Sequence, residues 1–425
     1  MEYTLGLSNP DIMIHFGEEA VSSPTTTLTY RPKTIYADIK ESELKLTAFK
    51  VLNDKKRFVI QVPHNVPKEY LEHILASVMV VLSNNEYKNP VKIVVTHPGN
   101  KKNPDIEHII ALLNLVQKAR LISMLPGNLG TPIHLAKILK KEFSCKTKIL
   151  THTYLYKHGF NLIRAVGESA KNPPCMLVVE SIVKESYPTV CVIGKGITFD
   201  TGGLALKTGP SINYMKYDKL GAVHGAMALA YLIQTCKGVN FVGVFPFAEN
   251  AVSDRSVRPG DVVKSFSGKT VEITDPDAEG RLILADALAY SKKYKPDLIV
   301  DIATLTGHAD SINCWHSGYY YAAPGENKLL FEEVSEKIGE RMLPMPTWSD
   351  YSDILKSSVA DLVNLPNNGC ADSFVAALFL KEFLPGETEW LHIDLAHEYN
   401  KQTSLPKGNG MRSIVAFVNA WVDKK

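Results

Sequence analysis

Residues 273–282 read Ile-Thr-Asp-Pro-Asp-Ala-Glu-Gly-Arg-Leu, so that three carboxylates crowd one short segment. An apolar, alanine-rich run from Leu282 to Tyr290 follows at once and predicts a buried helix. Carboxylates this close repel one another unless they are solvated or share a cation. The segment is therefore either an acidic loop that precedes a helix or one half of a metal site.

A second stretch upstream has the same mixture of charge and glycine. Residues 192–203 read Val-Ile-Gly-Lys-Gly-Ile-Thr-Phe-Asp-Thr-Gly-Gly, and Met215-Lys-Tyr-Asp218 follows them. Val190 to Lys195 predicts a short buried strand, and Leu220 to Leu232 predicts a helix. In an open α/β sheet, loops that leave the strands gather at their carboxyl ends, where ligands bind. We therefore expect the acidic residues of this stretch to lie at such an edge.

The glycines of this stretch exclude two nucleotide-binding patterns. It contains neither Gly-x-x-x-x-Gly-Lys-Ser/Thr nor Gly-x-Gly-x-x-Gly, so a phosphate loop and a dinucleotide fingerprint are both ruled out. Two simpler interpretations stay open from the residues alone. Gly194-Lys-Gly can be a tight turn, and Asp218 can be the N-cap of the helix that follows it.

Six short motifs follow one another in unbroken order between about residue 118 and the C-terminus. They are Ala165–Lys171, Lys195-Gly-Ile-Thr-Phe-Asp-Thr-Gly-Gly203, Met215-Lys-Tyr-Asp218, Asp277-Ala-Glu-Gly-Arg-Leu282, Ala303-Thr-Leu-Thr-Gly307 and Ala376-Ala-Leu-Phe-Leu-Lys-Glu-Phe383. Together they resemble the leucine aminopeptidase family, the two-zinc and usually hexameric cytosol aminopeptidases. No resemblance to the family is found before residue 118.

The resemblance implies that one lysine and four carboxylates hold two adjacent metal ions. The implied ligands are Lys195, Asp200, Asp218, Asp277 and Glu279, with Asp200 and Glu279 bridging the ions. This oxygen-rich donor set suits zinc first, with manganese, magnesium or cobalt as alternatives, rather than copper. A ligating Lys195 must be neutral, which two nearby dications would favour. Outside such a constellation, a lysine in a glycine loop is more often exposed to solvent.

The resemblance also implies how a peptide bond would be cut. Lys207 would polarise the scissile carbonyl, and Arg281 would hold a bicarbonate ion that takes the proton of the attacking water. Further substrate- or anion-binding positions would be Met215, Ala278, Gly280, Thr304, Leu305 and Gly307. The alternatives are a surface charge for Lys207 and a structural salt bridge from Arg281 to Asp275 or Asp286.

Some positions depart from the family pattern. Asp275 and Pro276 stand where asparagine and threonine are usual, and the proline stiffens the approach to the next carboxylate. His308 and His397 replace a small residue and a glycine beside the expected pocket. Their default interpretation is a packed or solvent-facing side chain, and the alternative is an altered specificity. The loop 365–372 also differs from the glycine-rich family version.

Composition agrees with an enzyme and excludes other classes of protein. The chain has 425 residues, 45% of them hydrophobic, a formal net charge of +2 and a mean hydropathy of −0.06. Such a charge gives no global attraction to nucleic acid or membranes. No secretory signal follows Met1 and no apolar run reaches the length of a membrane span. The six cysteines are dispersed without Cys-x-x-Cys spacing, which predicts reduced thiols in a cytoplasmic protein.

The length and the element pattern predict two α/β domains. Residues 1–118 would form a small N-terminal α/β domain with a connecting helix at 106–121, and residues 119–425 the dimetal catalytic domain. The catalytic domain would have a central mixed, largely parallel sheet flanked by helices. Strands are predicted at 58–62, 91–96, 176–180, 190–193, 239–245, 298–304 and 391–395, and a further helix at 70–82.

Two hypotheses of function follow. The first is a metal-dependent aminopeptidase of peptides, leucyl-type and homo-hexameric by resemblance, with no membrane partner. The second is an oligomeric scaffold or DNA-binding member of the same fold, for which Lys55-Lys-Arg57 and Lys137-Ile-Leu-Lys-Lys141 could contact phosphate. Because such charge runs are usually solvated faces and every implied ligand is retained, the sequence favours catalysis.

Overall fold

The computed structural model describes the chain in separate stretches. The structure describes residues 104–307, 317–322, 326–340, 342–346, 348–366, 372–395 and 405–425. It also describes the backbone of residues 26–30, 44–50, 56–61, 92–96 and 399–400. The chain forms two compact units, Met1–Gln117 with Lys337–Gly339 and Lys118–Glu336 with Glu340–Lys425.

The first unit contains a four-stranded sheet. Its strands are β1 (Thr26–Tyr30), β2 (Leu44–Lys50), β3 (Lys56–Gln61) and β4 (Lys92–Thr96), in that order. β3 and β4 pair in parallel, and the other pairs are antiparallel. β3 and β4 match two predicted strands, and α2 (Pro104–Ser123) matches the predicted connecting helix. The helix predicted at 70–82 lies outside the described residues, and the domain boundaries at 118 stay a prediction.

A nine-stranded sheet forms the centre of the second unit. The strand order is β14-β13-β16-β12-β7-β9-β6-β5, and β8 also pairs with β9. The strands are β5 (Lys146–Leu150), β6 (Cys175–Ser181), β7 (Thr189–Gly194), β8 (Gly196–Asp200), β9 (Asn240–Asn250), β12 (Leu298–Ala303), β13 (Gly318–Ala322), β14 (Met342–Pro344) and β16 (Glu389–Asp394). The central strands β16, β12, β7 and β9 are parallel, while β5, β6 and β13 join antiparallel neighbours. The predicted largely parallel sheet is therefore confirmed.

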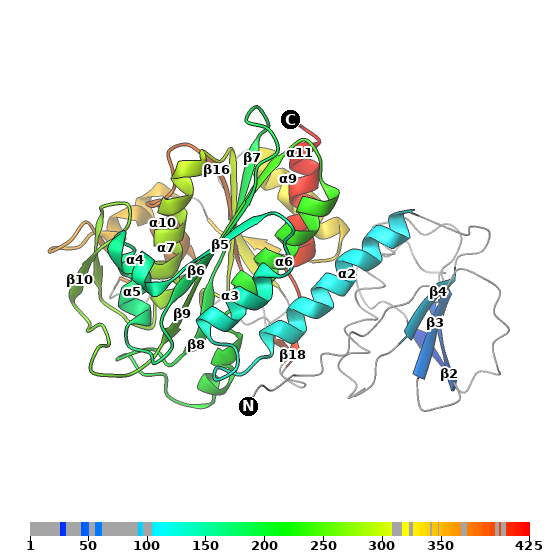
Figure 1. The fold of residues 1–425 in the computed structure, drawn as a ribbon, viewed down its shortest axis with the longest axis horizontal. Helices are drawn as coiled ribbons and strands as arrows, with labels where there is room; N and C mark the ends of the chain where they lie inside the picture. Colours follow the sequence, from blue (N-terminus) through cyan, green and yellow to red (C-terminus); the bar gives the residue numbers. More distant parts are fainter. Residues whose placement is uncertain are drawn as a thin grey trace. The chain divides into compact units, whose positions relative to one another are not determined.

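Helices cover both faces of this sheet (Figure 1). The helices are α3 (Pro132–Lys140), α4 (His152–Lys157), α5 (Asn161–Gly167), α6 (Leu220–Thr235), α7 (Glu279–Ser291), α9 (Glu326–Lys337), α10 (Asp372–Lys381) and α11 (Met411–Val422). α6 packs with α3 and α11 on one side, and α7 packs with α5 and α10 on the other. Every residue of α6 from Leu220 to Leu232 is buried, which explains its small, apolar composition.

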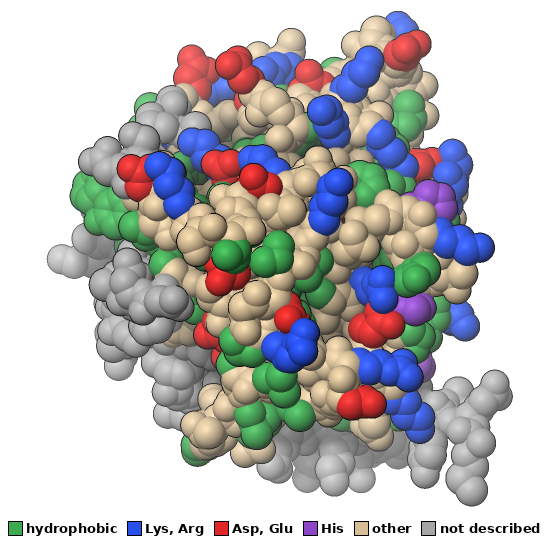
Figure 2. Space-filling model, turned by 90° about the vertical axis from the view of Figure 1, so that its left-hand side faces the viewer, with side chains coloured by type: hydrophobic (Ala, Val, Ile, Leu, Met, Phe, Trp, Pro, Cys, Tyr) green, Lys and Arg blue, Asp and Glu red, His purple; other side chains and the backbone are tan. Residues whose placement is uncertain are grey.

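Shorter elements complete the second unit. A small sheet has the order β10 (Asp261–Lys264), β11 (Thr270–Ile273) and β15 (Leu362–Val363), and β17 (Tyr399–Asn400) pairs with β18 (Leu405–Pro406). Three 3₁₀ helices are η1 (Pro210–Tyr217), η2 (Lys292–Tyr294) and η3 (Ser349–Leu355). Among the described helices, none is long and apolar enough to cross a membrane. On the face in Figure 2, basic and acidic side chains are interspersed.

Candidate metal centre

The predicted ligands come from two parts of the fold that meet at one edge of the central sheet. Lys195 joins β7 to β8, and Asp200 is the last residue of β8. Asp218 follows η1 and lies just before α6. Asp277 lies in the loop between β11 and α7, and Glu279 is the first residue of α7. These positions agree with the expected clustering at the carboxyl ends of parallel strands.

The side chains at these positions lie close together. Carboxylate oxygens of Asp200, Asp277 and Glu279 lie within 4.8 Å of one another. Lys195 Nζ lies 2.8 Å from Asp218 Oδ1 and 3.0 Å from Glu279 Oε1. The structure therefore brings all five predicted ligands into one buried cluster.

Lys207 is the second cation of this cluster. Its Nζ lies 2.9 Å from Asp200 Oδ2 and 2.5 Å from Asp277 Oδ1. Burial lowers the pKa of Lys207, but the carboxylates of Asp200, Glu279 and Asp277 together raise it by more, so the net shift is upward. Lys207 is therefore a protonated group held inside the site and not a solvated surface charge.

The carboxylates are in an environment that fits divalent cations. Burial, with the charges of Asp200 and Glu279, raises the pKa of Asp277 to about 8, and burial also raises the pKa of Asp218 and Glu279. Asp218 Oδ2 and Glu279 Oε2 are buried and have no hydrogen-bond partner among the described residues. Buried oxygens without donors are costly unless a cation satisfies them. The hard oxygen donors and the single nitrogen suit zinc, manganese or magnesium.

Gly280 makes room for Lys195 in this cluster. A Cβ atom at position 280 would lie 2.4 Å from Lys195 Cε, closer than atoms can approach. Lys195 Nζ also donates a hydrogen bond to the backbone oxygen of Thr304 at 2.8 Å. Any side chain at the second position of α7 would therefore displace the lysine from the carboxylates.

Two asparagines that the sequence analysis missed hold the acidic segments. Asn250 Nδ2 donates to Asp200 Oδ1 at 2.8 Å and to the oxygen of Pro276 at 3.1 Å. Asn364 Oδ1 accepts from the backbone nitrogens of Thr274 at 2.9 Å and Asp275 at 3.2 Å. A polar residue ending the long apolar run of β9 was a usable signal for Asn250. The two-residue strand before Asn364 offered none.

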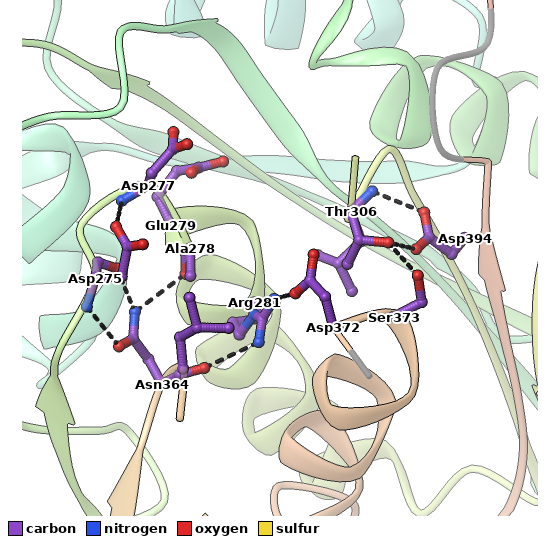
Figure 3. Close-up of polar contacts among 12 residues, drawn as sticks. Asp275, Asp277, Ala278, Glu279, Arg281, Thr306, Asn364, Asp372, Ser373 and Asp394 are labelled. Atoms are coloured by element: carbon purple, nitrogen blue, oxygen red, sulfur yellow. Dashed lines mark hydrogen bonds and ion pairs between the residues drawn. The ribbon is translucent and has the colours of Figure 1, made fainter. Parts of the chain in front are cut away.

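Arg281 contacts different partners from those considered in the sequence analysis. Its Nη1 donates to the oxygen of Asn364 at 3.0 Å, and its Nη2 lies 2.9 Å from Asp372 Oδ1 (Figure 3). Asp275 instead accepts a hydrogen bond from the nitrogen of Asp277 at 2.8 Å. Asp286 accepts from the backbone nitrogens of residues 162, 163 and 266. The alternative salt bridges from Arg281 to Asp275 or Asp286 are therefore wrong.

The segment after β12 borders the cluster. Thr304 Oγ1 donates to Asp218 Oδ1 at 2.9 Å. The nitrogen of Leu305 donates to Asp394 Oδ1 at 2.9 Å, and Thr306 Oγ1 donates to Asp394 Oδ2 at 2.6 Å. Gly307 is exposed. The structure thus places Thr304 against a predicted ligand and fixes Leu305 through Asp394.

The remaining predicted residues are placed as follows. Met215 is buried in η1, and its oxygen accepts a hydrogen bond from the nitrogen of Asp218 at 3.3 Å. Ala278 lies just before α7, and its oxygen accepts a hydrogen bond from Asn364 Nδ2 at 3.4 Å. His308 and His397 lie outside the described residues, as does the loop 367–371. Their effect on specificity stays a prediction.

Comparison with known proteins gives consistent matches over the second unit. The family model described as "Cytosol aminopeptidase family, catalytic domain" matches residues 117–415. A probable cytosol aminopeptidase of Desulforapulum autotrophicum is 34% identical over 77% of this chain and 65% of that protein. Another, from Cenarchaeum symbiosum, is 38% identical over 71% of this chain and 64% of that protein. The chain thus spans less than two thirds of the length of these curated relatives.

Solved structures show the same fold. The chain is similar to the bottromycin maturation enzyme BotP, with a TM-score of 0.75 and 27% identity over 84% of this chain and 81% of that one. A structure of BotP in complex with Mn has a TM-score of 0.76 and 28% identity over the same shares. The similarity therefore extends over most of both chains.

Proposed function

The chain belongs to the cytosol aminopeptidase family, and we propose that it is a metal-dependent aminopeptidase that releases the N-terminal residue of peptides. The observation that carries this proposal is the largely buried cluster of Asp200, Asp218, Asp277 and Glu279, in which two oxygens have no hydrogen-bond donor among the described residues. A structural cluster would be expected to satisfy such oxygens from within the protein.

The cluster would hold two divalent cations. The residues that would hold them are Lys195, Asp200, Asp218, Asp277 and Glu279. Zinc is the first candidate, with manganese, magnesium and cobalt as alternatives, and the Mn complex of BotP supports manganese among these. When bound, the ions would supply a nucleophilic water at neutral pH and bind the free α-amino group.

Lys207 would stabilise the negative charge that develops on the carbonyl oxygen. Its ammonium is fixed by Asp200 and Asp277, so it needs no reorganisation during the reaction. Its side chain keeps 17% of its surface exposed, while that of Lys195 keeps 4%. Of the two lysines, Lys207 is therefore the one that a substrate could reach.

Arg281 would hold the anion that accepts the proton of the attacking water. Its guanidinium is buried beside the loop that carries Asp277, and Asn364 fixes one of its nitrogens. The family resemblance makes bicarbonate the expected anion. The substrate itself would contact Met215, Ala278, Gly280, Thr304, Leu305 and Gly307, with a leucyl-type preference. A cytoplasmic homo-hexamer is proposed from the resemblance alone.

The proposal is tested by metal analysis together with a panel of peptides and aminoacyl-amides. We expect about two divalent ions per chain, and hydrolysis that chelators abolish and zinc, manganese or cobalt restores. Lys207→Ala should lower turnover about 100- to 1000-fold while the metal content stays near that of the wild type. Lys356→Ala, which removes an exposed lysine paired with Asp353, is the matched control. A folded, metal-loaded protein that cleaves no member of the panel would favour the scaffold hypothesis instead.

A further inference from the structure

Arg281 already has a carboxylate partner within the chain. Its side chain is 3% exposed, and its Nη2 lies 2.9 Å from Asp372 Oδ1. The backbone oxygen of Asn364 accepts a hydrogen bond from Arg281 Nη1 at 3.0 Å, whereas Arg281 Nε has no partner among the described residues. Figure 3 shows Arg281 between the Asp275–Glu279 segment and Asp372. The buried cation is therefore neutralised from α10, far along the chain from α7.

Asp372 is fixed in this position by its neighbour in the sequence. Asp372 is the first residue of α10, and Ser373 Oγ forms a hydrogen bond with Thr306 Oγ1. Thr306 Oγ1 in turn donates to Asp394 Oδ2 at 2.6 Å, at the end of β16. Side-chain hydrogen bonds thus connect the start of α10 to the segment after β12 and to the end of β16 (Figure 3). A carboxylate on such a rigid element costs little entropy to hold in place.

We propose that Asp372 is a positioning residue that supplies Arg281 with its anion from within the chain and thereby excludes dissolved bicarbonate. The inference rests on the proposed function only for its catalytic consequence, and it replaces the bicarbonate expected from the family resemblance with a carboxylate of the chain itself. A dissolved anion would have to displace a tethered carboxylate from a buried guanidinium. It would also break the ion pair between Arg281 and Asp372, whose side chain is only 18% exposed. Bicarbonate is therefore a poor competitor at Arg281 in this chain.

The experiment compares thermal unfolding of the metal-loaded protein in bicarbonate and in chloride at equal ionic strength and pH. The wild type should show no difference. Asp372→Ala should gain a rise in Tm that grows with the logarithm of the bicarbonate concentration and reaches about 2–4 °C at roughly tenfold excess over the Kd. Formate, which carries the same carboxylate group, should act in the same way. The double variant Asp372→Ala with Arg281→Ala should lose the response, which would place the anion on Arg281.

Two further variants keep the test decisive. Asp372→Asn retains the size of the side chain and a good helix-start residue, so it is measured in the same way if Asp372→Ala does not fold. Asp261→Ala breaks an exposed arginine–aspartate pair, Arg258 with Asp261, away from the site and should gain no anion response. A wild type stabilised by bicarbonate as strongly as the variants would overturn the proposal. So would a folded Asp372→Ala that shows no response to either anion.

Turnover gives a second, separate measurement. Asp372→Ala should lose about a hundredfold in turnover and recover most of it in bicarbonate or formate, while wild-type turnover should not change in carbonate-depleted buffer. A merely structural role for Asp372 would not produce rescue by a small anion. The thermal measurement contains no substrate and therefore tests anion binding at Arg281 independently of catalysis. An inactive wild type would contradict the proposed function without deciding whether Asp372 excludes bicarbonate.

Discussion

The metal centre and the cluster around Glu340 both bury charged groups, but they satisfy them differently. Glu340 Oε1 accepts from Arg412 Nε at 2.9 Å, and its Oε2 accepts from the nitrogen of Gly410 at 3.0 Å and from Ser413 Oγ at 2.6 Å. In the proposed metal centre, one oxygen each of Asp218 and Glu279 has no such donor within the described part of the chain. The start of α11 therefore supplies Glu340 with a counter-charge and with donors for both oxygens. In the proposed metal centre, Lys195 and Lys207 supply positive charge, but they leave two carboxylate oxygens without a donor among the residues described.

This difference separates a structural buried charge from a functional one. Removing a partner from a satisfied cluster leaves an uncompensated charge and costs stability. Removing a carboxylate from a crowded, unsatisfied cluster relieves repulsion and costs only the bound ligand. We therefore expect substitutions in the two regions to act on different measurements.

Glu279→Gln should produce the largest effect on function. It removes one charge from a side chain that is 2% exposed and lies next to Lys195. We expect the bound metal to fall and kcat/KM to drop about a thousandfold or more. The chelated variant should be at least as stable as the chelated wild type, because one repelling charge is gone. Unchanged metal content by elemental analysis would contradict the assignment.

Glu340→Ala should produce the largest effect on stability. It removes the carboxylate that pairs with the buried Arg412 and should lower the free energy of unfolding by about 3–5 kcal/mol. Metal content and turnover per folded molecule should not change. Glu382→Ala, which breaks an exposed pair with Lys269, serves as control and should cost about 1 kcal/mol or less in urea unfolding. Equal losses of unfolding free energy in Glu340→Ala and Glu382→Ala would contradict the expected difference between buried and exposed ion pairs.

Asn250→Ala should have an intermediate effect confined to the metal centre. The substitution removes the hydrogen bonds that orient Asp200 and hold Pro276. Loss of such supporting partners weakens metal affinity about 10- to 100-fold, which competition with a chelator would measure. Asn172→Ala is the matched control, since Asn172 bonds Glu249 and no proposed ligand. A similar loss of affinity in both variants would argue against the role of Asn250.

The smallest effect should come from His392, whose Nδ1 lies 2.6 Å from Asp301 Oδ1. Burial lowers the pKa of His392, but the charge and hydrogen bond of Asp301 and the charge of Asp394 together raise it more, so the net shift is upward. The folded protein then holds this proton longer than the unfolded chain. Its stabilisation is complete below about pH 6.5 and is lost as pH rises through the raised pKa, by at most about 1.4 kcal/mol per pH unit.

Urea unfolding between pH 6 and 9 measures this dependence. His392→Gln should flatten the fall in stability, and His158→Gln, at an exposed histidine, should leave it unchanged. A stability that increases with pH in the wild type, and no longer does in His392→Gln, would reverse the sign expected here.

The central fold was predictable because its strands are continuous apolar runs. The strands predicted at 190–193 and 298–304 correspond to β7 and β12 within one or two residues. β5, with its alternating Lys-Thr-Lys, and the two-residue β15 were missed, because edge and very short strands lack such runs. The antiparallel pairing of β6 follows from contacts distant in sequence and could not be deduced from its own residues.

The candidate site was predictable where its residues cluster in the sequence. The five proposed ligands and Lys207 belong to two short segments, so a motif could identify them together. Asn364 and Asp372 come from later segments and act only because β15 and α10 fold back beside α7. No local pattern marks either residue, and the two carboxylates that the sequence suggested as partners of Arg281, Asp275 and Asp286, are the wrong ones.

The hydrogen bonds of Asn364 also set an order of events during synthesis. This asparagine lies 89 residues after Asp275, and its side chain forms hydrogen bonds with both the backbone nitrogen and the backbone oxygen of Asp275. A nascent chain that has produced every proposed ligand still lacks the residue that shapes the loop between β11 and α7. Metal capture would therefore mark the arrival of the C-terminal segments, and a chain released early would carry all the ligands without the geometry to use them.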